Sequence, residues 1–206
     1  MPFISFEGID GAGKSTHVQW LAEVLRAHQQ IVITTREPGG TPLGETLRQL
    51  LLNDAMSADT ELLLMFAARA EHLAQVIRPA LQRGEWVLTD RFTDASYAYQ
   101  CGGRGIQPHR LAVLEQWVQQ GLQPDLTFLF DVEVDVAQQR LTAHHQPDRF
   151  EREQGDFFER VRTVYLQRAA AEPQRIRVVR TDRSIAAIRC ELSELLRPLL
   201  PARACE

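Results

Sequence analysis

The sequence predicts an α/β fold: a five-stranded parallel sheet with helices on both faces, and a short lid at about residues 140–150. Two observations predict this class. Five short runs rich in β-branched and aromatic residues alternate with segments of helical periodicity, and strands separated by helices pair in parallel. No composition shift, repeat or low-complexity linker divides the 206 residues, so we expect one domain spanning residues 1–206.

The elements follow in order along the chain. The expected strands are Phe3–Glu7, Ile31–Thr35, Trp86–Asp90, Leu126–Val132 and Ile176–Arg180. The expected helices are Lys14–His28, Leu43–Leu52, Asp59–Arg83, Pro108–Gln120, Val134–Ala143, Gln154–Ala171 and Ser184–Leu196. Because ligands bind at the carboxyl ends of the strands in such sheets, functional residues are expected in the segments that follow the strands.

A glycine-rich segment directly follows the first expected strand. It matches the pattern G-x-x-x-x-G-K-[ST] and comprises Gly8, Ile9, Asp10, Gly11, Ala12, Gly13, Lys14 and Ser15. Its glycines permit backbone angles at which successive N–H groups point at one anion, Lys14 adds a charge, and Ser15 offers a hydroxyl to Mg²⁺. The segment up to Thr16 therefore predicts nucleotide-phosphate binding in a P-loop NTPase fold, the alternative being a glycine-rich turn with a chance Lys-Ser pair.

The net charge and the cysteine content exclude several classes of protein. A formal charge of −4 is unlike that of a protein that coats nucleic acid, so we expect small phosphorylated ligands and no nucleic-acid partner. No apolar run reaches the ~18 residues of a membrane span, and residues 1–2 lead directly into the first expected strand, so we expect a cytoplasmic protein without a membrane partner. Cys101, Cys190 and Cys205 are odd in number and widely spaced, which fits reduced thiols.

Charged residues lie at the ends of the second and third expected strands. Asp90 ends an apolar strand, an arrangement by which P-loop proteins hold Mg²⁺, although an N-cap for the next helix is an alternative. Arg91 is placed to donate two hydrogen bonds to one phosphate, and a surface ion pair is the alternative. Arg36 and Glu37 precede a Pro-Gly-Gly turn that lets the backbone approach a ligand, and the neighbouring P-loop makes Arg36 a candidate for a second phosphate.

Together with other segments along nearly the whole chain, these residues resemble those of bacterial thymidylate kinases. The similar segments are the phenylalanine and glutamate before the P-loop, Arg36–Thr41, Met65–Arg69, Asp90–Phe92, Ala98–Gln100, Gly102–Gly105, Pro124–Thr127 and Asp148–Glu151. Their order and spacing carry the resemblance. It implies ATP-dependent phosphorylation of dTMP to dTDP for dTTP biosynthesis, with Mg²⁺ as cofactor, in a cytosolic homodimer.

The resemblance also implies roles at the phosphate and sugar of the acceptor. Arg36 and Arg91 would grip the dTMP phosphate, and Glu37 belongs to the same substrate site. Asp10 would lie near the 3′-hydroxyl and the reacting phosphates. Tyr99 would crowd the 2′ position and so select the deoxy form.

The thymine base would be read by Arg69, Ser96 and Gln100. The trio Ser96, Tyr99 and Gln100 has the i, i+3, i+4 spacing of one helical face, which an ordinary amphipathic helix shares. Many relatives carry a phenylalanine four residues before the thymine-reading arginine, but here that position is Met65. We hypothesise that Phe66, three residues before Arg69, stacks on the base, and a core position for Phe66 is the alternative.

The lid departs from the family pattern as well. Gly11 stands where a sister subtype carries arginine, and members with glycine there resemble the subtype whose lid supplies the transition-state arginines. His144 stands where a lid arginine is expected, and neutral histidine replaces guanidinium poorly. We expect Arg149 to carry this charge with help from Arg140, the alternative being His144 as imidazolium.

The resemblance implies a transfer that needs no general base, because the acceptor phosphate oxygen is already anionic. Catalysis then consists of positioning and charge neutralisation. The residues expected to act in it are Asp10, Lys14, Arg91, Arg140 and Arg149. Three alternatives are a deoxynucleoside kinase with Glu37 or Asp10 as its base, a nucleotide-binding regulatory switch, and another nucleoside-monophosphate kinase.

Overall fold

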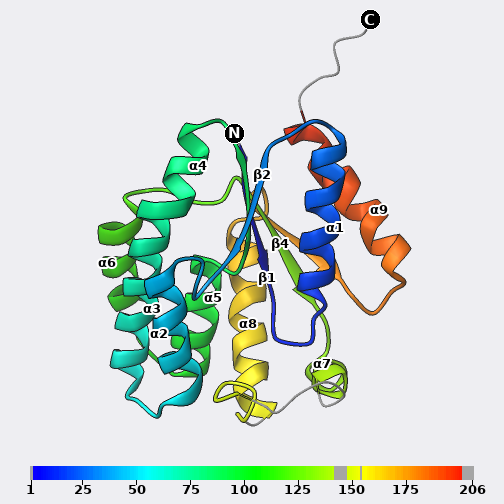
Figure 1. Ribbon diagram of the computed structural model, residues 1–206. Helices are drawn as coiled ribbons and strands as arrows, with labels where there is room; N and C mark the ends of the chain where they lie inside the picture. Colours follow the sequence, from blue (N-terminus) through cyan, green and yellow to red (C-terminus); the bar gives the residue numbers. More distant parts are fainter. Residues whose placement is uncertain (1, 142–147, 154, 201–206) are drawn as a thin grey trace, which may run out of the picture.

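The computed structural model describes residues 2–141, 148–153 and 155–200. Its centre is an all-parallel five-stranded sheet with the strand order β2-β3-β1-β4-β5 (Figure 1), which confirms the expected fold class. Because β1 is the middle strand, the loop that follows it opens at the centre of the sheet's carboxyl edge. The strands are β1 (Phe3–Glu7), β2 (Val32–Arg36), β3 (Trp86–Asp90), β4 (Leu126–Asp131) and β5 (Ile176–Arg180).

Helices cover both faces of the sheet (Figure 1). On one face α1 contacts β1, β2 and β3, and α9 contacts β5; on the other face α4 contacts β3, and α8 contacts β4 and β5. An outer layer forms where α3 contacts both α2 and α6. The long helices are α1 (Lys14–Ala27), α2 (Pro42–Asn53), α3 (Ala58–His72), α6 (Pro108–Gln119), α7 (Val134–Leu141), α8 (Gly155–Ala171) and α9 (Ile185–Leu196), and a short α4 (Arg78–Gln82) follows α3.

Two helical segments differ from the expected ones. The expected helix Asp59–Arg83 consists of α3, the π-helical segment η1 (Leu73–Ile77) and α4. The π-helical segment η1 ends two residues before Pro79, which has no N–H to donate to the carbonyl four residues earlier. After β3, the short helix α5 (Thr93–Ser96) continues into a second π-helical segment, η2 (Tyr97–Gly103). A π-helical segment in a region of candidate binding residues is a common feature of functional sites.

The strand boundaries differ slightly from the expected ones. β2 begins at Val32, one residue after the expected start, and it extends to Arg36. β4 ends at Asp131 rather than Val132. In the register of the sheet Arg36 lies opposite Asp90, so the ends of β2 and β3 are neighbours at the carboxyl edge.

Apolar packing makes the sheet a fixed platform for this edge. All five residues of β1 are buried, and the ring of Phe6 lies against those of Phe128 and Phe130, with centroids 5.5 and 6.0 Å apart. Burial of one such side chain stabilises a fold by about 1.5–3 kcal/mol. The position of the loop after β1 is therefore set by a strand that is buried along its whole length.

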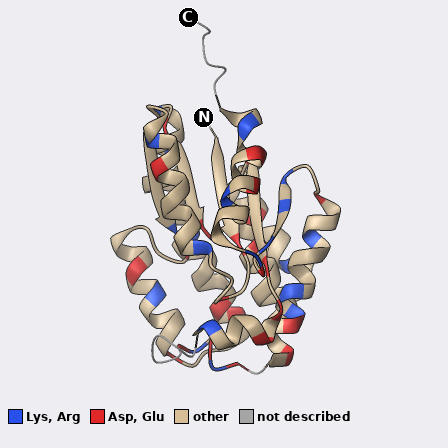
Figure 2. Cartoon of the chain, turned by 90° about the vertical axis from the view of Figure 1, so that its right-hand side faces the viewer, with Lys and Arg blue, Asp and Glu red and all other residues tan. Residues whose placement is uncertain are grey.

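Charges of both signs lie interspersed on the face that Figure 2 presents. Within the part of the chain that the structure describes, no helix combines the length and the apolar character needed to cross a membrane.

Candidate active site

The loop between β1 and α1 has the conformation that its sequence pattern predicts. Gly8 takes a φ of 132°, and a Cβ atom at this position would lie 2.4 Å from the carbonyl oxygen of Phe130 in β4. A side chain is therefore excluded where the loop leaves the sheet. The loop ends at Lys14, where α1 begins, so the N-terminal end of the helix dipole faces it.

Lys14 is the only lysine of the sequence, and its side chain is buried. Its Nζ donates hydrogen bonds of 2.9 Å to the carbonyl oxygens of Gly8 and Ile9, and lies 3.9 Å from Asp10 Oδ1. Burial, together with the charge of Arg91, lowers the pKa of Lys14 below its ordinary value despite the nearby carboxylates. A compact ammonium group thus lies within the loop, in the place where a P-loop lysine meets phosphate.

Helix α7 packs directly on the P-loop at Gly11. The φ of Gly11 is 81°, and a Cβ atom there would lie 2.2 Å from the carbonyl oxygen of Ala137 in α7. One turn further along α7, Arg140 donates from Nη2 to the carbonyl oxygen of Thr181 (2.9 Å), which follows β5, and from Nη1 to that of Gly11 (3.4 Å). The absence of a side chain at Gly11 therefore allows a helix that carries Arg140 to reach the P-loop.

Ser15 and Asp90 face each other across the ends of α1 and β3. Ser15 Oγ lies 3.5 Å from Asp90 Oδ2, while Asp90 Oδ1 is buried and has no hydrogen-bond partner among the described residues. A hydroxyl and an unpaired carboxylate oxygen suit a Mg²⁺ ion that keeps several of its waters. The described residues contain no cluster of three or more His, Cys, Asp or Glu side chains placed to hold a metal. The helix α5 begins at Thr93, and its N-cap residue is Phe92 without a side-chain hydrogen bond, so the structure does not use Asp90 as an N-cap.

Arg91 takes a left-handed backbone conformation, with a φ of 72°. Its Nη2 donates to Asp10 Oδ1 (2.6 Å) and to the Tyr99 hydroxyl (3.1 Å), and its Nη1 donates to the carbonyl oxygen of Gly8 (2.9 Å). Burial alone would raise the pKa of Asp10, but the charges of Arg91 and Lys14 outweigh it and hold that pKa at about 2. Such strain outside glycine is typical of functional sites, and here it turns a guanidinium toward the P-loop.

A buried carboxyl group lies behind Arg91. Glu7 Oε1 accepts from the backbone N–H of Phe92 (2.7 Å), and Oε2 accepts from the Tyr165 hydroxyl (2.8 Å), which is 3.3 Å from Arg91 Nη1. Burial raises the pKa of Glu7 to about 8, and the charge of Asp94 adds to the effect although Arg91 opposes it. Glu7 fixes the backbone just after Arg91, a role that the sequence pattern alone does not reveal.

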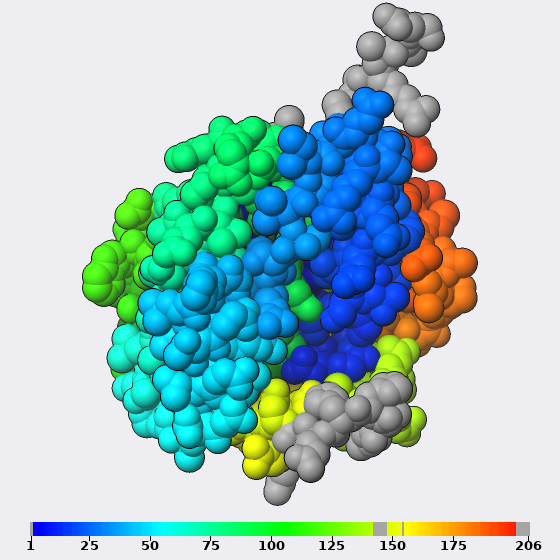
Figure 3. Space-filling model, in the orientation of Figure 1, coloured from blue at the N-terminus to red at the C-terminus, as the bar shows by residue number. Residues whose placement is uncertain are grey.

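A cavity of about 610 Å³, partly open to solvent, begins at Asp10 and Arg91 and extends toward α3 and η2. In Figure 3 it is the recess between the segment around residues 40–50 and the P-loop. Ser96, Tyr99 and Gln100 all line it, together with Arg69 and Glu37. The expected trio therefore does share one surface, although η2 begins within it at Tyr97.

The far end of the cavity is a buried network of charges. Arg69 Nε donates to Glu37 Oε2 (2.7 Å), and Glu37 Oε1 lies 2.9 Å from His72 Nδ1. Arg69 Nη2 donates to Ser96 Oγ (2.9 Å) and to the carbonyl oxygen of Phe92 (3.1 Å). Burial alone would raise the pKa of Glu37, but Arg69 and His72 outweigh it and hold that pKa below its ordinary value. This carboxylate thus orients Arg69.

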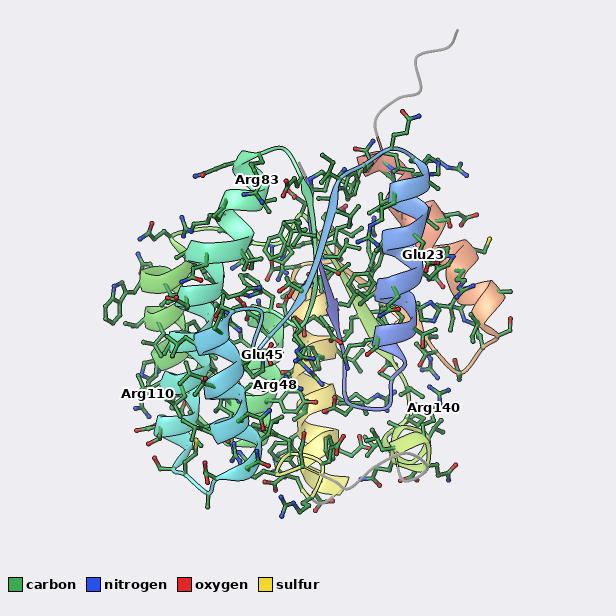
Figure 4. All side chains as sticks on the ribbon, viewed as in Figure 1. Glu23, Glu45, Arg48, Arg83, Arg110 and Arg140 are labelled. Atoms are coloured by element: carbon green, nitrogen blue, oxygen red, sulfur yellow. The ribbon has the colours of Figure 1, made fainter. Side chains whose placement is uncertain are left out.

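The arginines that line the cavity differ from the expected set. Arg36 is 54% exposed, pairs with Glu45 Oε2 at 2.8 Å, and does not line the cavity. Arg48 of α2 lines it instead and donates from Nη1 to the carbonyl oxygen of Pro38 (3.0 Å). In Figure 4 Glu45 and Arg48 lie between α2 and α8. The sequence analysis missed Arg48, whose only signal is that it occurs on the helix directly after the Pro-Gly-Gly turn.

The expected stacking role of Phe66 is not supported by its position. Phe66 is buried in an apolar cluster with Leu62, Ile106 and Leu111, and the residue of this pair that lines the cavity is Met65. Met65 and Arg69 are four residues apart and share one face of α3, whereas Phe66 turns toward α6. The structure therefore favours the core alternative for Phe66.

The structure places the two expected lid arginines in different surroundings. Arg149 Nε donates to the carbonyl oxygen of Leu51 at the end of α2 (2.9 Å), and Nη1 lies 2.7 Å from Glu61 Oε2 on α3. Arg149 thus contacts the outer helices and not the P-loop, which Arg140 contacts (Figure 4). His144 lies outside the described residues.

Fold and site together define a class. The P-loop lies on a parallel sheet of order 2-3-1-4-5, beside a cavity lined by arginines. This arrangement is typical of a P-loop protein that holds a nucleotide next to another small anion.

Comparison with known proteins narrows the class to one family. The family model described as thymidylate kinase matches residues 6–192. The chain is 64% identical over 197 residues to the thymidylate kinase of Cupriavidus metallidurans, with 96% of this chain and 98% of the relative covered, and 61% identical to that of Thiobacillus denitrificans (96% and 97%). The crystal structure of thymidylate kinase from Ehrlichia chaffeensis has a TM-score of 0.78 at 34% identity and covers 95% of this chain and 98% of that one. The chain belongs to the thymidylate kinase family.

Proposed function

We propose that this chain phosphorylates dTMP to dTDP, with ATP as the phosphoryl donor and Mg²⁺ as cofactor, as a cytoplasmic step of dTTP biosynthesis. The observation that carries the proposal is the single cavity that joins Arg69, Ser96 and Gln100 at one end to Arg91 and the P-loop at the other. A nucleoside monophosphate laid along it has its base among buried polar groups and its phosphate beside the donor. Family membership supports the same reaction.

At the donor end, the P-loop N–H groups and Lys14 bind the phosphates of ATP. Ser15 and Asp90 would hold Mg²⁺, which supplies neutralisation of the charge on the donor phosphates. Arg140 lies beside this loop and adds a guanidinium near the carbonyl oxygen of Gly11. Asp10 stays ionised at neutral pH, because its pKa is about 2, and it orients Arg91.

At the acceptor phosphate we assign the leading roles to Arg91 and Arg48. Burial and the charge of Arg36 lower the pKa of Arg48, so Arg36, Arg48 and Arg91 form a region of positive charge at this end. Such a region attracts a dianionic phosphate and brings its oxygen into line with the donor. Arg36 contributes its positive charge from outside the cavity lining, and its guanidinium is paired with Glu45.

At the base end Arg69, Ser96 and Gln100 read thymine, and Met65 offers the apolar surface against its ring. Tyr99 lies between base and phosphate, with its hydroxyl 3.2 Å from Asp10 Oδ2. A ribose 2′-hydroxyl would meet the Tyr99 ring, which supports selection of the deoxy form.

Two observations disfavour a deoxynucleoside kinase. Such an enzyme needs a carboxylate base for an uncharged hydroxyl, but Asp10 has a pKa of about 2 and Glu37 is paired with Arg69 and His72. Neither carboxylate is matched to proton abstraction near neutral pH.

The test is ADP release in a coupled assay with dTMP, dUMP, thymidine and AMP as acceptors. We expect the highest kcat/KM with dTMP and background rates with thymidine and AMP. Equal turnover of thymidine would contradict the proposal. Tight dTMP binding without any ADP release would instead indicate a nucleotide-binding switch.

We further propose that the chain forms a homodimer through α3 and α6. Leu63 on α3 and Val113 and Trp117 on α6 are large apolar residues, and Trp117 is 74% exposed. A patch of this kind on neighbouring helices suits a two-fold interface with a second copy of the chain. Sedimentation velocity should give a dimer for the wild type and a monomer for Trp117→Glu, and a monomeric wild type would refute this proposal.

A further inference from the structure

Glu61 on α3 is a buried carboxylate that the proposed reaction does not use. Its side chain is 1% exposed and has partners from two other segments. Gln100 Nε2 donates to Oε1 (2.9 Å), Arg104 Nε donates to Oε2 (3.1 Å), and Arg149 Nη1 lies 2.7 Å from Oε2. Glu61 therefore connects α3 with η2 and with the residues at the end of the lid.

These contacts fix the orientation of the Gln100 amide. A carboxylate between two guanidinium groups accepts hydrogen bonds and offers none, so only the amide nitrogen of Gln100 is suited to face it. The amide group is planar, and its oxygen is consequently the arm turned away from Glu61. Because the Gln100 side chain lines the cavity, the polar atom that it offers to a ligand is an acceptor.

The neighbouring groups at this end of the cavity are donors. Ser96 Oγ accepts from Arg69 Nη2, which leaves its own O–H as a donor, and Arg69 Nη1 is buried without a hydrogen-bond partner among the described residues. One acceptor among donors complements the edge of a thymine or uracil, where the N3–H lies between two carbonyl oxygens. Cytosine presents an unprotonated N3 beside an amino group and would face Gln100 acceptor to acceptor.

We propose that Glu61 is a positioning residue that sets base selectivity: by holding the Gln100 amide in one orientation, it makes the cavity accept pyrimidine nucleotides with an N3–H and reject cytosine nucleotides. The proposal rests on the proposed function, since it takes this cavity to be the nucleoside-monophosphate site. A buried acceptor facing another acceptor leaves both groups unpaired, which is how polar sites reject near-isosteres.

The test compares dTMP and dCMP with the variant Glu61→Gln. The new amide can donate as well as accept, so Gln100 can turn, and the dTMP/dCMP ratio of kcat/KM should fall at least about tenfold. Glu153→Gln is the matched control, because it removes the other carboxylate partner of Arg104 without touching Gln100, and its ratio should stay that of the wild type. An equal loss for both nucleotides in Glu61→Gln would overturn the proposal, because a purely structural role predicts that result.

A double variant tests whether Glu61 acts through Gln100. The ratio for Glu61→Gln combined with Gln100→Met should equal that of Gln100→Met alone, and an additive further loss would contradict the proposal. Should Glu61→Gln not fold, NMR of the wild type bound to dTMP decides: the Gln100 amide protons should show NOEs to the Glu61 methylenes. NOEs to the base in their place would overturn the proposal.

Calorimetric titration of the wild type with dTMP and dCMP, read together with the kcat/KM values, separates the proposed function from the proposed role of Glu61. Selective dTMP binding without turnover would refute the proposed function and leave the role of Glu61 standing. Turnover of dTMP and dCMP with similar kcat/KM would refute the role of Glu61 alone.

Discussion

The two ends of the cavity are built in different ways. At the base end the charged groups are paired and buried, as in the contact between Arg69 and Glu37, whose side chains are 3% and 5% exposed. At the phosphate end the side chains of the paired Arg91 and Asp10 are 15% and 32% exposed, and Arg36 and Arg140, which lie outside the cavity lining, are more exposed. The base end is thus buried more completely than the phosphate end, beside which exposed arginines lie.

Because of this difference, we expect substitutions at the base end to lower stability and acceptor affinity, and substitutions at the phosphate end to lower mainly the catalytic rate. A change at the base end leaves a buried charge unpaired, so it lowers the free energy of unfolding together with the affinity for the acceptor. A change at the phosphate end removes an interaction that strengthens as charge moves in the transition state, so it lowers the rate and leaves the fold intact.

The largest expected effect is at the base end. Arg69→Met removes the guanidinium that pairs with buried Glu37, and we expect the free energy of unfolding to fall by about 3–5 kcal/mol. Urea denaturation measures this change. The matched control is Arg110→Met, which breaks the solvent-exposed pair with Asp59 and should leave stability nearly unchanged. Equal losses in the free energy of unfolding would show that the pair of Arg69 and Glu37 contributes no more to stability than an exposed ion pair does.

The next largest effect is at the P-loop. Lys14→Met should lower kcat about 10²–10³-fold, because it removes a donor to the transferring phosphates. The free energy of unfolding should not fall, since burial already disfavours this charge. Steady-state ADP release and thermal unfolding measure the two quantities. A large loss of stability with a small loss of rate would reverse the comparison between the two ends.

A smaller effect distinguishes the two lid arginines. Arg140→Ala should lower kcat/KM for ATP at least tenfold, about 1.4 kcal/mol, and leave KM for dTMP unchanged. Arg149→Ala should instead lower the melting temperature, because it removes one partner of buried Glu61. If Arg149→Ala proves to be the slower enzyme, Arg149 leaves Glu61 during the reaction and the lid assignment from sequence is right.

The last expected effect concerns pH, and it accumulates gradually over several pH units. The pKa of Glu7 is about 8 in the folded protein against an ordinary value of 4.5, so between these values the folded state keeps a proton that the unfolded chain releases. Stability should therefore fall as the pH rises from about 5 to about 8, by up to about 1.4 kcal/mol per pH unit. Glu7→Gln should flatten this slope in urea titrations at several pH values. An unchanged slope would show that Glu7 does not hold this proton.

The sequence predicted what depends on local pattern. The strands β1 and β4 were found because their apolar runs are buried from end to end, and the P-loop because its spacing is specific. The sequence did not predict which way individual side chains point. Met65 and Phe66 both have a helical spacing to Arg69, and only the packing of α3 against α6 decides which one lines the cavity. Likewise Glu61 gains its partners from segments distant in sequence, and Arg48 lines the cavity only because of the way α2 lies beside it, so no local pattern marks either residue.

The contact between Gly11 and α7 has a consequence for how such enzymes can change over evolutionary time. A side chain at position 11 would collide with the carbonyl oxygen of Ala137, on the helix that brings Arg140 to the loop. A side chain at position 11 is therefore incompatible with an α7 this close to the loop. A substitution of Gly11 would require α7 to move away, so the residue at position 11 and the placement of Arg140 constrain each other epistatically.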